Sequence, residues 1–342
     1  MASPPPLALG LACVSTFPPR PCGLGTFTQD LVDGLTALQP PAAVVIAAID
    51  AAGERHAYGR LVRLRLEEGD GASYIEAARY LNRMPDVDVV SVQHDFSRFG
   101  IWRKAFEEDY LVPMLDALHK PVVVTMHTVP PQPEPLVRQT VQAMAHRAAA
   151  IVVMARTAKT LFRRDYGLDQ NALARVCFIP HGVPAGASAG LPDGRAVAKR
   201  ALGLAGHRVL STFGLINEGK GIEFALDALP ALVAKYPDLL YLVIGETHPD
   251  VRKLRGEGYR EDLIARCRQL AVVEHVRFVN RFLLQDELLS YLAATDVYLT
   301  PYLGAGQITS GTLAYALGYG KAIVSTPYLY ARELLAGGRG LL

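Results

Sequence analysis

Short, almost continuously apolar runs alternate along the chain with longer segments in which apolar residues recur at helical spacing. In the first half, the apolar runs predict strands at 7–14, 42–49, 87–92, 121–126, 150–154 and 176–179. The amphipathic segments predict helices at 26–38, 72–84, 104–119, 134–149 and 157–166. Strands that are apolar throughout are covered on both faces, and alternating strands and helices are typical of a parallel, doubly wound sheet.

A stretch rich in Gly, Ala and Pro, at 181–196, interrupts this pattern, and the alternation then restarts. Strands are predicted at 209–213, 239–244, 276–279, 297–300 and 322–325. Helices are predicted at 222–236, 260–270, 286–294, 311–319 and 329–336. We therefore expect an α/β protein with two Rossmann-like domains, at 1–183 and 197–342, joined by a linker at 184–196.

Composition supports two domains and excludes several classes of protein. The 342 residues, 50% of them hydrophobic, suffice for two cores of ordinary size. The net charge is only +2, and no stretch combines clustered Lys and Arg with aromatic residues, so nucleic-acid binding is not expected. The N-terminus lacks the basic region of a signal peptide, and no apolar run is long enough to span a bilayer. Peripheral contact with a membrane is left open.

The cysteines and the missing metal motifs narrow the chemistry further. Cys13, Cys177 and Cys267 lie in apolar or helical surroundings, and no two of the four cysteines, the fourth being Cys22, form a CxxC pair. This pattern predicts buried free thiols and a cytoplasmic protein. The chain contains no HExxH motif and no EF-hand loop, so we expect neither a bound metal nor a cofactor.

In parallel sheets, ligands bind beyond the carboxyl ends of the strands, and three features of the first half lie there. Between the first strand and the first helix, Gly23 and Gly25 allow close backbone approach, and Thr26 is predicted to cap the helix, with Gln29 as its capping-box partner. Such a turn can hold an anion or a sugar hydroxyl, although a plain turn explains it too. His127 and His94 each end a strand, where an imidazole binds a hydroxyl or serves the fold.

The second half has two further candidate segments. The first, GLINEGKG at 214–221, is a glycine-rich turn whose Lys220 can reach a diphosphate. It is not a Walker motif, because Ile222 follows and no hydroxyl comes after the lysine. The second is the start of the helix near 311, where free N–H groups and hydroxyls form a phosphate cradle. Its residues, which also serve as ordinary helix caps, are Thr309, Ser310, Gly311 and Thr312.

Taken in order, these segments resemble the retaining glycosyltransferases of GT-B fold, family 4. The resemblance runs over almost the whole chain. Its carriers include PCGLGTFT, TMH with His127, IPHGV, FGLINEGKGIEFALDALPAL, YLVIGETHP, VRFVNRFL and GYGKAIVSTPY. It implies that the two domains face each other across a cleft, with the acceptor on the N-terminal side and the nucleotide-sugar on the C-terminal side. It also implies metal-independent transfer of a hexose to a sugar or another hydroxyl acceptor.

The resemblance assigns roles to single residues. His127 lies near the donor sugar and assists the reaction, and His94 is assigned to the acceptor. Lys220 contacts the diphosphate of the donor, and Arg281 lies in the loop by the base. The other residues that it implies for donor binding are Gly23, Gly25, Gly214, Glu246, Gln307, Thr309, Ser310, Gly311 and Thr312.

The chain departs from the family pattern at three positions. Gln307 and Tyr315 occupy the places of two glutamates eight residues apart, the first of which contacts the donor sugar and the second the ribose. Leu215 replaces an arginine that often follows Gly214. An alternative hypothesis is therefore a non-catalytic GT-B homologue that binds nucleotide or sugar, or acts as a partner subunit.

The last residues, GGRGLL, have the pattern of another strand's beginning. Members of the family usually continue with further helices. We therefore expect the second domain to be truncated at its C-terminus, to expose an apolar edge, and to be a fragment of a longer protein.

Overall fold

The computed structural model describes residues 9–103, 106–184 and 194–342. The chain divides into two compact units, an N-terminal unit of residues 1–182 and a C-terminal unit of residues 183–342. Most of the linker predicted at 184–196 lies outside the described residues. Its last three residues do not belong to a linker, because α7 (Gly194–Ala201) begins inside it.

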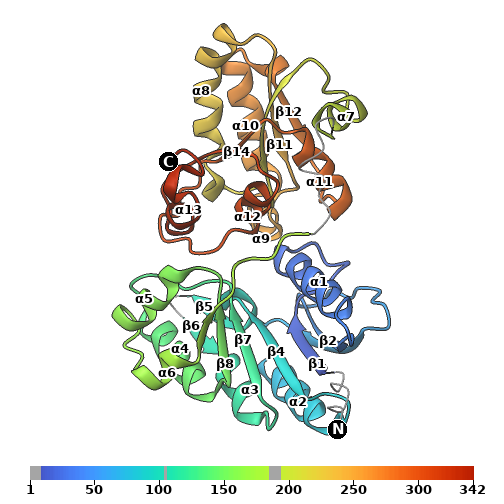
Figure 1. The fold of residues 1–342 in the computed structure, drawn as a ribbon, viewed down its shortest axis with the longest axis vertical. Helices are drawn as coiled ribbons and strands as arrows, with labels where there is room; N and C mark the ends of the chain where they lie inside the picture. The colour runs from blue at the N-terminus through green and yellow to red at the C-terminus, as the bar shows by residue number, and fades with distance from the viewer. Residues whose placement is uncertain (1–8, 104–105, 185–193) are drawn as a thin grey trace, which may run out of the picture. The chain divides into compact units, whose positions relative to one another are not determined.

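The N-terminal unit is built on a parallel sheet of seven strands in the order β3-β2-β1-β4-β7-β8-β9 (Figure 1). The strands are β1 (Gly10–Ser15), β2 (Ala43–Asp50), β3 (Val62–Glu67), β4 (Val89–His94), β7 (Val122–Met126), β8 (Ala150–Val153) and β9 (Val176–Phe178). The connecting helices are α1 (Gly23–Thr36), α2 (Gly71–Arg83), α3 (Leu111–Ala117), α4 (Pro135–Arg147), α5 (Arg156–Arg164) and α6 (Gln170–Ala174). β1 is buried along its whole length, as expected for a central strand.

The C-terminal unit repeats this plan with a five-stranded parallel sheet in the order β12-β11-β10-β13-β14. The strands are β10 (Arg208–Phe213), β11 (Leu239–Ile244), β12 (Val276–Val279), β13 (Val297–Thr300) and β14 (Ala322–Ser325). The helices after α7 are α8 (Ile222–Lys235), α9 (Pro249–Arg255), α10 (Gly258–Gln269), α11 (Gln285–Ala294), α12 (Gly311–Gly318) and α13 (Leu329–Leu334). α8 and α10 lie side by side, as do α7 and α11 (Figure 1).

The core of the C-terminal unit follows from the helical spacing of apolar residues. On α8, Ile222, Leu226 and Leu229 are fully buried. They pack with residues of α10 and with alternate residues of β11, including Tyr241 and Val243. Because the side chains of a strand alternate between faces, this cluster covers one face of the sheet.

Both sheets confirm the predicted parallel α/β class. In each, the chain order reverses next to the first strand, between β1 and β4 and between β10 and β13. At such a switch point, the loops beyond the carboxyl ends of the strands diverge and leave room for a ligand. The candidate ligand-binding segments are therefore those that follow β1, β4, β7, β10 and β13.

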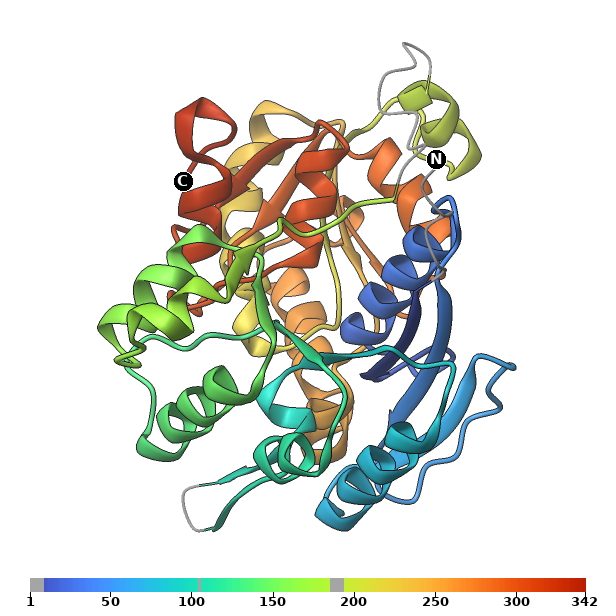
Figure 2. The same ribbon diagram turned by 60° about the horizontal axis from the view of Figure 1, so that its bottom comes forward.

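Several local predictions were wrong. The helix predicted at 104–119 is partly an antiparallel hairpin of β5 (Gly100–Arg103) and β6 (Phe106–Asp109), separate from the main sheet (Figure 2). α3 begins only at Leu111, because the carboxylate of Asp109 accepts hydrogen bonds from the backbone N–H groups of Leu111 and Val112. Strand β3 and helices α6, α7 and α9 were not predicted. Cys177 is exposed rather than buried, because its side chain points outward from β9.

The sheet edge at β14 exposes apolar side chains, as the sequence predicted. Val324 on β14 is 41% exposed, and Leu341, which pairs with it in a parallel bridge, is 69% exposed.

Candidate functional site

His127 follows β7 directly, at the carboxyl edge of the N-terminal sheet, and its ring is held by a chain of hydrogen bonds. The Nε2 atom of His127 is 3.0 Å from Oε1 of the buried Gln93, and the Gln93 amide nitrogen donates to Ser91 Oγ at 3.0 Å. Because the Gln93 oxygen faces the imidazole, this network assigns the proton to Nε2 and leaves Nδ1 as an acceptor.

The environment of His127 keeps its imidazole neutral. Desolvation by the surrounding protein lowers the pKa of His127 to about 3, and the ring of His181 adds to this, whereas the charge of Asp95 opposes it. The ring packs edge-on against Phe27 of α1 at 4.7 Å between centroids, and His181 approaches the same phenyl ring at 5.1 Å. At neutral pH His127 is therefore a fixed, uncharged hydrogen-bonding group.

The glycine segment before α1 differs from the prediction. α1 begins at Gly23, so Cys22 rather than Thr26 is its N-cap, and the Thr26 hydroxyl donates to the Cys22 carbonyl inside the first turn. An added Cβ at Gly23 would meet nothing within 4 Å, whereas one at Gly25 would contact the backbone of Phe17 at 3.5 Å. The capping box predicted for Thr26 and Gln29 is therefore wrong, and both glycines lie in the first turn of the helix.

His94 ends β4 and is fully buried, so its ring does not reach the surface and does not support the assigned contact with an acceptor. The ring packs between Phe96, at 4.7 Å, and Phe99, at 5.3 Å. Within the described residues neither ring nitrogen has a hydrogen-bond partner, and burial lowers the pKa of His94 to about 4. Its backbone carbonyl accepts a hydrogen bond from the N–H of His127, so His94 positions that residue through the main chain.

Acidification is expected to destabilise the protein through His94. Its pKa is about 6.5 in the unfolded chain and about 4 in the folded state, so the unfolded state binds more protons between these values. Stability is complete above pH 6.5 and falls as the pH decreases toward 4, by about 2 kcal/mol between pH 7 and pH 5. Urea unfolding of the wild type and of His94→Leu at both pH values measures this. Equal pH dependence in the two proteins would contradict the expectation.

Asp95 was not predicted, although it lies next to His94. Its carboxylate accepts hydrogen bonds from Thr128 Oγ1 at 2.8 Å and from the backbone N–H of Ser97 at 3.0 Å. Burial acts to raise the pKa of Asp95, but a hydrogen bond from the Ser97 hydroxyl, together with those from Thr128 and the Ser97 N–H, holds it below its usual range. An ionised carboxylate thus lies near the neutral imidazole of His127. No spacing in the sequence indicated this, because the contact joins the ends of two separate strands.

In the C-terminal unit, several predicted residues meet around the Lys220 ammonium. Lys220 Nζ donates to the hydroxyl of Tyr302 at 2.9 Å, and that hydroxyl is 2.8 Å from Thr312 Oγ1. Thr312 Oγ1 is in turn 3.1 Å from Ser310 Oγ. An added Cβ at Gly214 would lie 3.4 Å from Lys220 Nζ, so this glycine borders the same group. We call Lys220, Tyr302, Ser310 and Thr312 the lysine cluster.

The lysine cluster includes the start of α12. Ser310 is the N-cap, its hydroxyl accepts a hydrogen bond from the N–H of Leu313, and Gly311 is the first residue of the helix. The predicted helix start is therefore confirmed, with Ser310 rather than Thr309 as the cap. Free N–H groups at a helix N-terminus and a nearby ammonium together favour an anionic ligand.

Three other predicted donor residues lie outside the lysine cluster. Glu246 follows β11, is largely buried, and pairs with Arg252 at 3.4 Å. Arg281 follows β12 and forms an exposed ion pair with Glu287. Gln307 donates from its amide to the Thr309 carbonyl at 2.9 Å. They share the carboxyl edge of the sheet with the lysine cluster but form no hydrogen bond or ion pair with it among the described residues.

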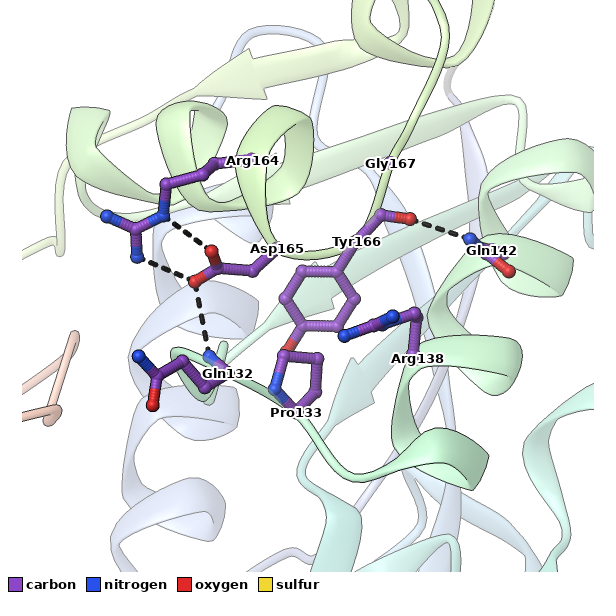
Figure 3. A pocket seen from close by; sticks show the side chains of 8 residues that line it. All are labelled: Gln132, Pro133, Arg138, Gln142, Arg164, Asp165, Tyr166 and Gly167. Carbon is purple, nitrogen blue, oxygen red and sulfur yellow. Dashed lines mark hydrogen bonds and ion pairs between the residues drawn. The ribbon is translucent and has the colours of Figure 1, made fainter.

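A separate cavity of about 350 Å³ lies in the N-terminal unit, between α4 and the end of α5 (Figure 3). It contains none of the residues predicted for function. Its lining is mainly polar. The backbone of Gln132 is left-handed, with φ of 49°, and its N–H donates a hydrogen bond to the carboxylate of Asp165. The lining residues are Gln132, Pro133, Arg138, Gln142, Arg164, Asp165, Tyr166 and Gly167.

In the described part of the chain, no three His, Cys, Asp or Glu side chains gather in a way that would hold a metal ion. Among the described helices, none combines the length and the apolarity needed to cross a bilayer.

Two parallel α/β sheets, of seven and five strands, are typical of the GT-B fold of glycosyltransferases. Residues 21–186 match Glycosyltransferase Family 4, and residues 207–342 match Glycosyl transferases group 1. The chain belongs to the group 1, family 4 glycosyltransferases.

The chain is also similar to individual known proteins. A phosphatidyl-myo-inositol mannosyltransferase of Mycobacterium tuberculosis is 31% identical over 121 residues, which cover 35% of this chain and 28% of that protein. The match thus spans less than a third of the length of this curated relative. Anabaena HepE, solved in complex with UDP and glucose, superimposes with a TM-score of 0.69 at 15% identity, covering 98% of this chain and 85% of HepE.

The sucrose-phosphate synthase of Thermosynechococcus elongatus gives a TM-score of 0.69 at 16% identity, over 93% of this chain and 81% of that one. At such low identity, the structural similarities show the shared fold alone.

Proposed function

We propose that the protein is a retaining, metal-independent glycosyltransferase that moves a hexose from a nucleoside-diphosphate sugar to a sugar or another hydroxyl acceptor. The observation that carries this proposal is the lysine cluster. Its ammonium and the N-terminus of an eight-residue helix converge at the switch point of a parallel sheet. Positive charge fixed beside free N–H groups stabilises the diphosphate that leaves in the reaction.

The two units then have different tasks. The C-terminal unit binds the donor, with Lys220 and the start of α12 on the diphosphate. The N-terminal unit supplies His127, which hydrogen-bonds the donor sugar through its free Nδ1, and carries the acceptor. The mannosyltransferases among the relatives support a hexose, and their phosphatidyl-inositol acceptor leaves peripheral membrane contact open for this chain.

A second candidate is a non-catalytic homologue that binds nucleotide or sugar or acts as a partner subunit. It is favoured by the two positions where family members carry glutamates. The Gln307 side chain turns to the Thr309 carbonyl, and the buried Tyr315 hydroxyl accepts a hydrogen bond from Gln285 at 3.4 Å. Neither position supplies a carboxylate for the hydroxyls of the donor.

Binding and turnover separate these candidates. We expect UDP, GDP or their sugar conjugates to raise the melting temperature, because ligands that bind only the folded state stabilise it by mass action. We also expect release of nucleoside diphosphate from at least one donor of a UDP-sugar and GDP-sugar panel, unchanged by EDTA. No thermal shift at millimolar ligand would contradict both nucleotide-binding functions. A shift without any turnover would favour the non-catalytic homologue.

A further inference from the structure

The turn that carries Lys220 and the loop that carries Tyr302 are locked together by their backbones. The N–H of Leu303 donates to the carbonyl of Gly219 at 3.0 Å. Gly221 has φ of 60°, and an added Cβ there would lie 2.1 Å from the Pro301 carbonyl oxygen. Only glycine allows this approach. The lysine and the tyrosine therefore meet because their main chains fix them side by side.

The Tyr302 side chain holds the lysine in two ways. Its hydroxyl accepts a hydrogen bond from Nζ at 2.9 Å, and Nζ also lies 4.1 Å from the ring centroid. The ring itself is 2% exposed and stacks on Tyr328, at 5.4 Å between centroids and 19° between planes. A buried, stacked ring has little freedom to move, so it fixes the position of the ammonium.

Tyr302 holds the ammonium without neutralising it. Within the described residues, Lys220 forms no ion pair with a carboxylate, and Glu218 in the same turn pairs with Arg255 instead, at 2.6 Å. Burial acts to raise the pKa of Tyr302, but the charge of Lys220 and the hydrogen bonds of the hydroxyl, to Lys220 and Thr312 among others, together hold this pKa below its usual range. The positive charge is therefore positioned in advance and available to an anion.

The tyrosine hydroxyl also separates two places that attract anions. One is the Lys220 ammonium, and the other is the start of α12 with Ser310 and Thr312. Tyr302 joins them through two hydrogen bonds, of 2.9 Å to the lysine and 2.8 Å to the threonine. Two adjacent groups that attract anions match two linked phosphates better than they match a single phosphate.

On the basis of the proposed function, we propose that Tyr302 is a positioning residue that makes the site prefer nucleoside diphosphates to monophosphates. It does so by holding Lys220 one phosphate away from the start of α12. Its removal leaves the helix N-terminus intact for the first phosphate but lets the lysine side chain move, so affinity is lost for the second phosphate alone.

The test compares Tyr302→Phe with Tyr328→Phe, which removes the other hydroxyl of the same stacked pair. The described hydrogen bonds to Lys220 and Thr312 come from Tyr302 and not from Tyr328, so Tyr328→Phe leaves the link between the lysine and the threonine in place. Calorimetry measures the Kd values of UDP, UMP, GDP and GMP. In Tyr302→Phe we expect diphosphate affinity to fall about tenfold with monophosphate affinity unchanged. In Tyr328→Phe we expect the ratio of the two affinities to equal that of the wild type.

The outcomes distinguish this inference from the function on which it rests. The role of Tyr302 is overturned if Tyr302→Phe leaves the ratio of diphosphate to monophosphate affinity unchanged, which includes an equal loss for both nucleotides. In that case, diphosphate binding by the wild type still supports the proposed function. A reduced ratio in Tyr328→Phe as well overturns the role of Tyr302 too, because the effect would then not be specific to the hydroxyl that Lys220 contacts. Wild-type protein that binds no diphosphate overturns the proposed function itself. The ratio is independent of the fraction of folded variant.

Discussion

Replacing His127 with alanine is expected to lower the turnover number for sugar transfer about 100-fold, with the Kd of the donor changed less than about threefold. The imidazole is neutral, because its pKa is lowered to about 3, and Gln93 fixes its orientation. A fixed hydrogen-bonding group at the reacting sugar acts mainly in the transition state, so its loss reduces turnover more than binding. Initial rates at saturating donor, with calorimetry of the donor, give the two values.

His181→Ala is the matched control for this experiment. His181 also packs against the ring of Phe27, at a similar distance, and it forms no described hydrogen bond with Gln93, so its removal disturbs the same packing but leaves the Gln93 network in place. We expect it to retain turnover within about threefold. Equal losses in the two variants would assign the effect to packing around Phe27. An unchanged rate in His127→Ala would remove His127 from the reaction.

Replacing Lys220 with alanine is expected to weaken nucleoside-diphosphate binding by about 1.5–3 kcal/mol, which is roughly 10- to 150-fold in Kd. Among the described residues, no carboxylate pairs with the Lys220 ammonium. A phosphate of the ligand is therefore the first negatively charged group to pair with it. Calorimetry with UDP and GDP measures the change. We expect the loss to be smaller at high salt, because ions screen the attraction in the wild type.

Lys235→Ala tests whether charge alone matters. Lys235 lies at the last position of α8, whose first residue, Ile222, comes two positions after Lys220. The two substitutions remove the same charge from opposite ends of one helix. We expect Lys235→Ala to leave diphosphate affinity within about twofold of the wild type. Equal effects of the two substitutions would mean that net charge, rather than the position of Lys220, governs binding.

The sequence predicted the elements whose local residue pattern is strong. β11 and the start of α12 were found with their observed bounds, because a six-residue apolar run and a Ser-Gly pair before a helical pattern are unambiguous. β3 lies at the edge of the sheet, and it was missed because its alternating apolar and charged residues, VRLRLE, differ from the continuous apolar runs that indicated the other strands. The hairpin of β5 and β6 was missed because glutamates and apolar residues favour a helix locally, and tertiary pairing overrides that preference.

The candidate site was predictable only where one segment carried its own signal. Lys220 and Ser310 lie in glycine- and hydroxyl-rich turns, and the sequence singled out both. Tyr302 and Asp95 gain their roles from partners far along the chain, Lys220 and Thr128. Such contacts depend on the register of whole strands. The Thr26 cap failed for a local reason, since the helix starts one turn earlier than its apolar spacing indicates.

The backbone hydrogen bond between Leu303 and Gly219 has a consequence for grafting loops between relatives. The turn at 214–221 and the loop at 301–312 behave as one part, although some 80 residues separate them. A chimera that imports only one of these segments breaks the contact of Gly221 with Pro301 and misplaces the imported lysine or tyrosine. Exchanging both segments together keeps their fit, so the two segments are best grafted as a pair.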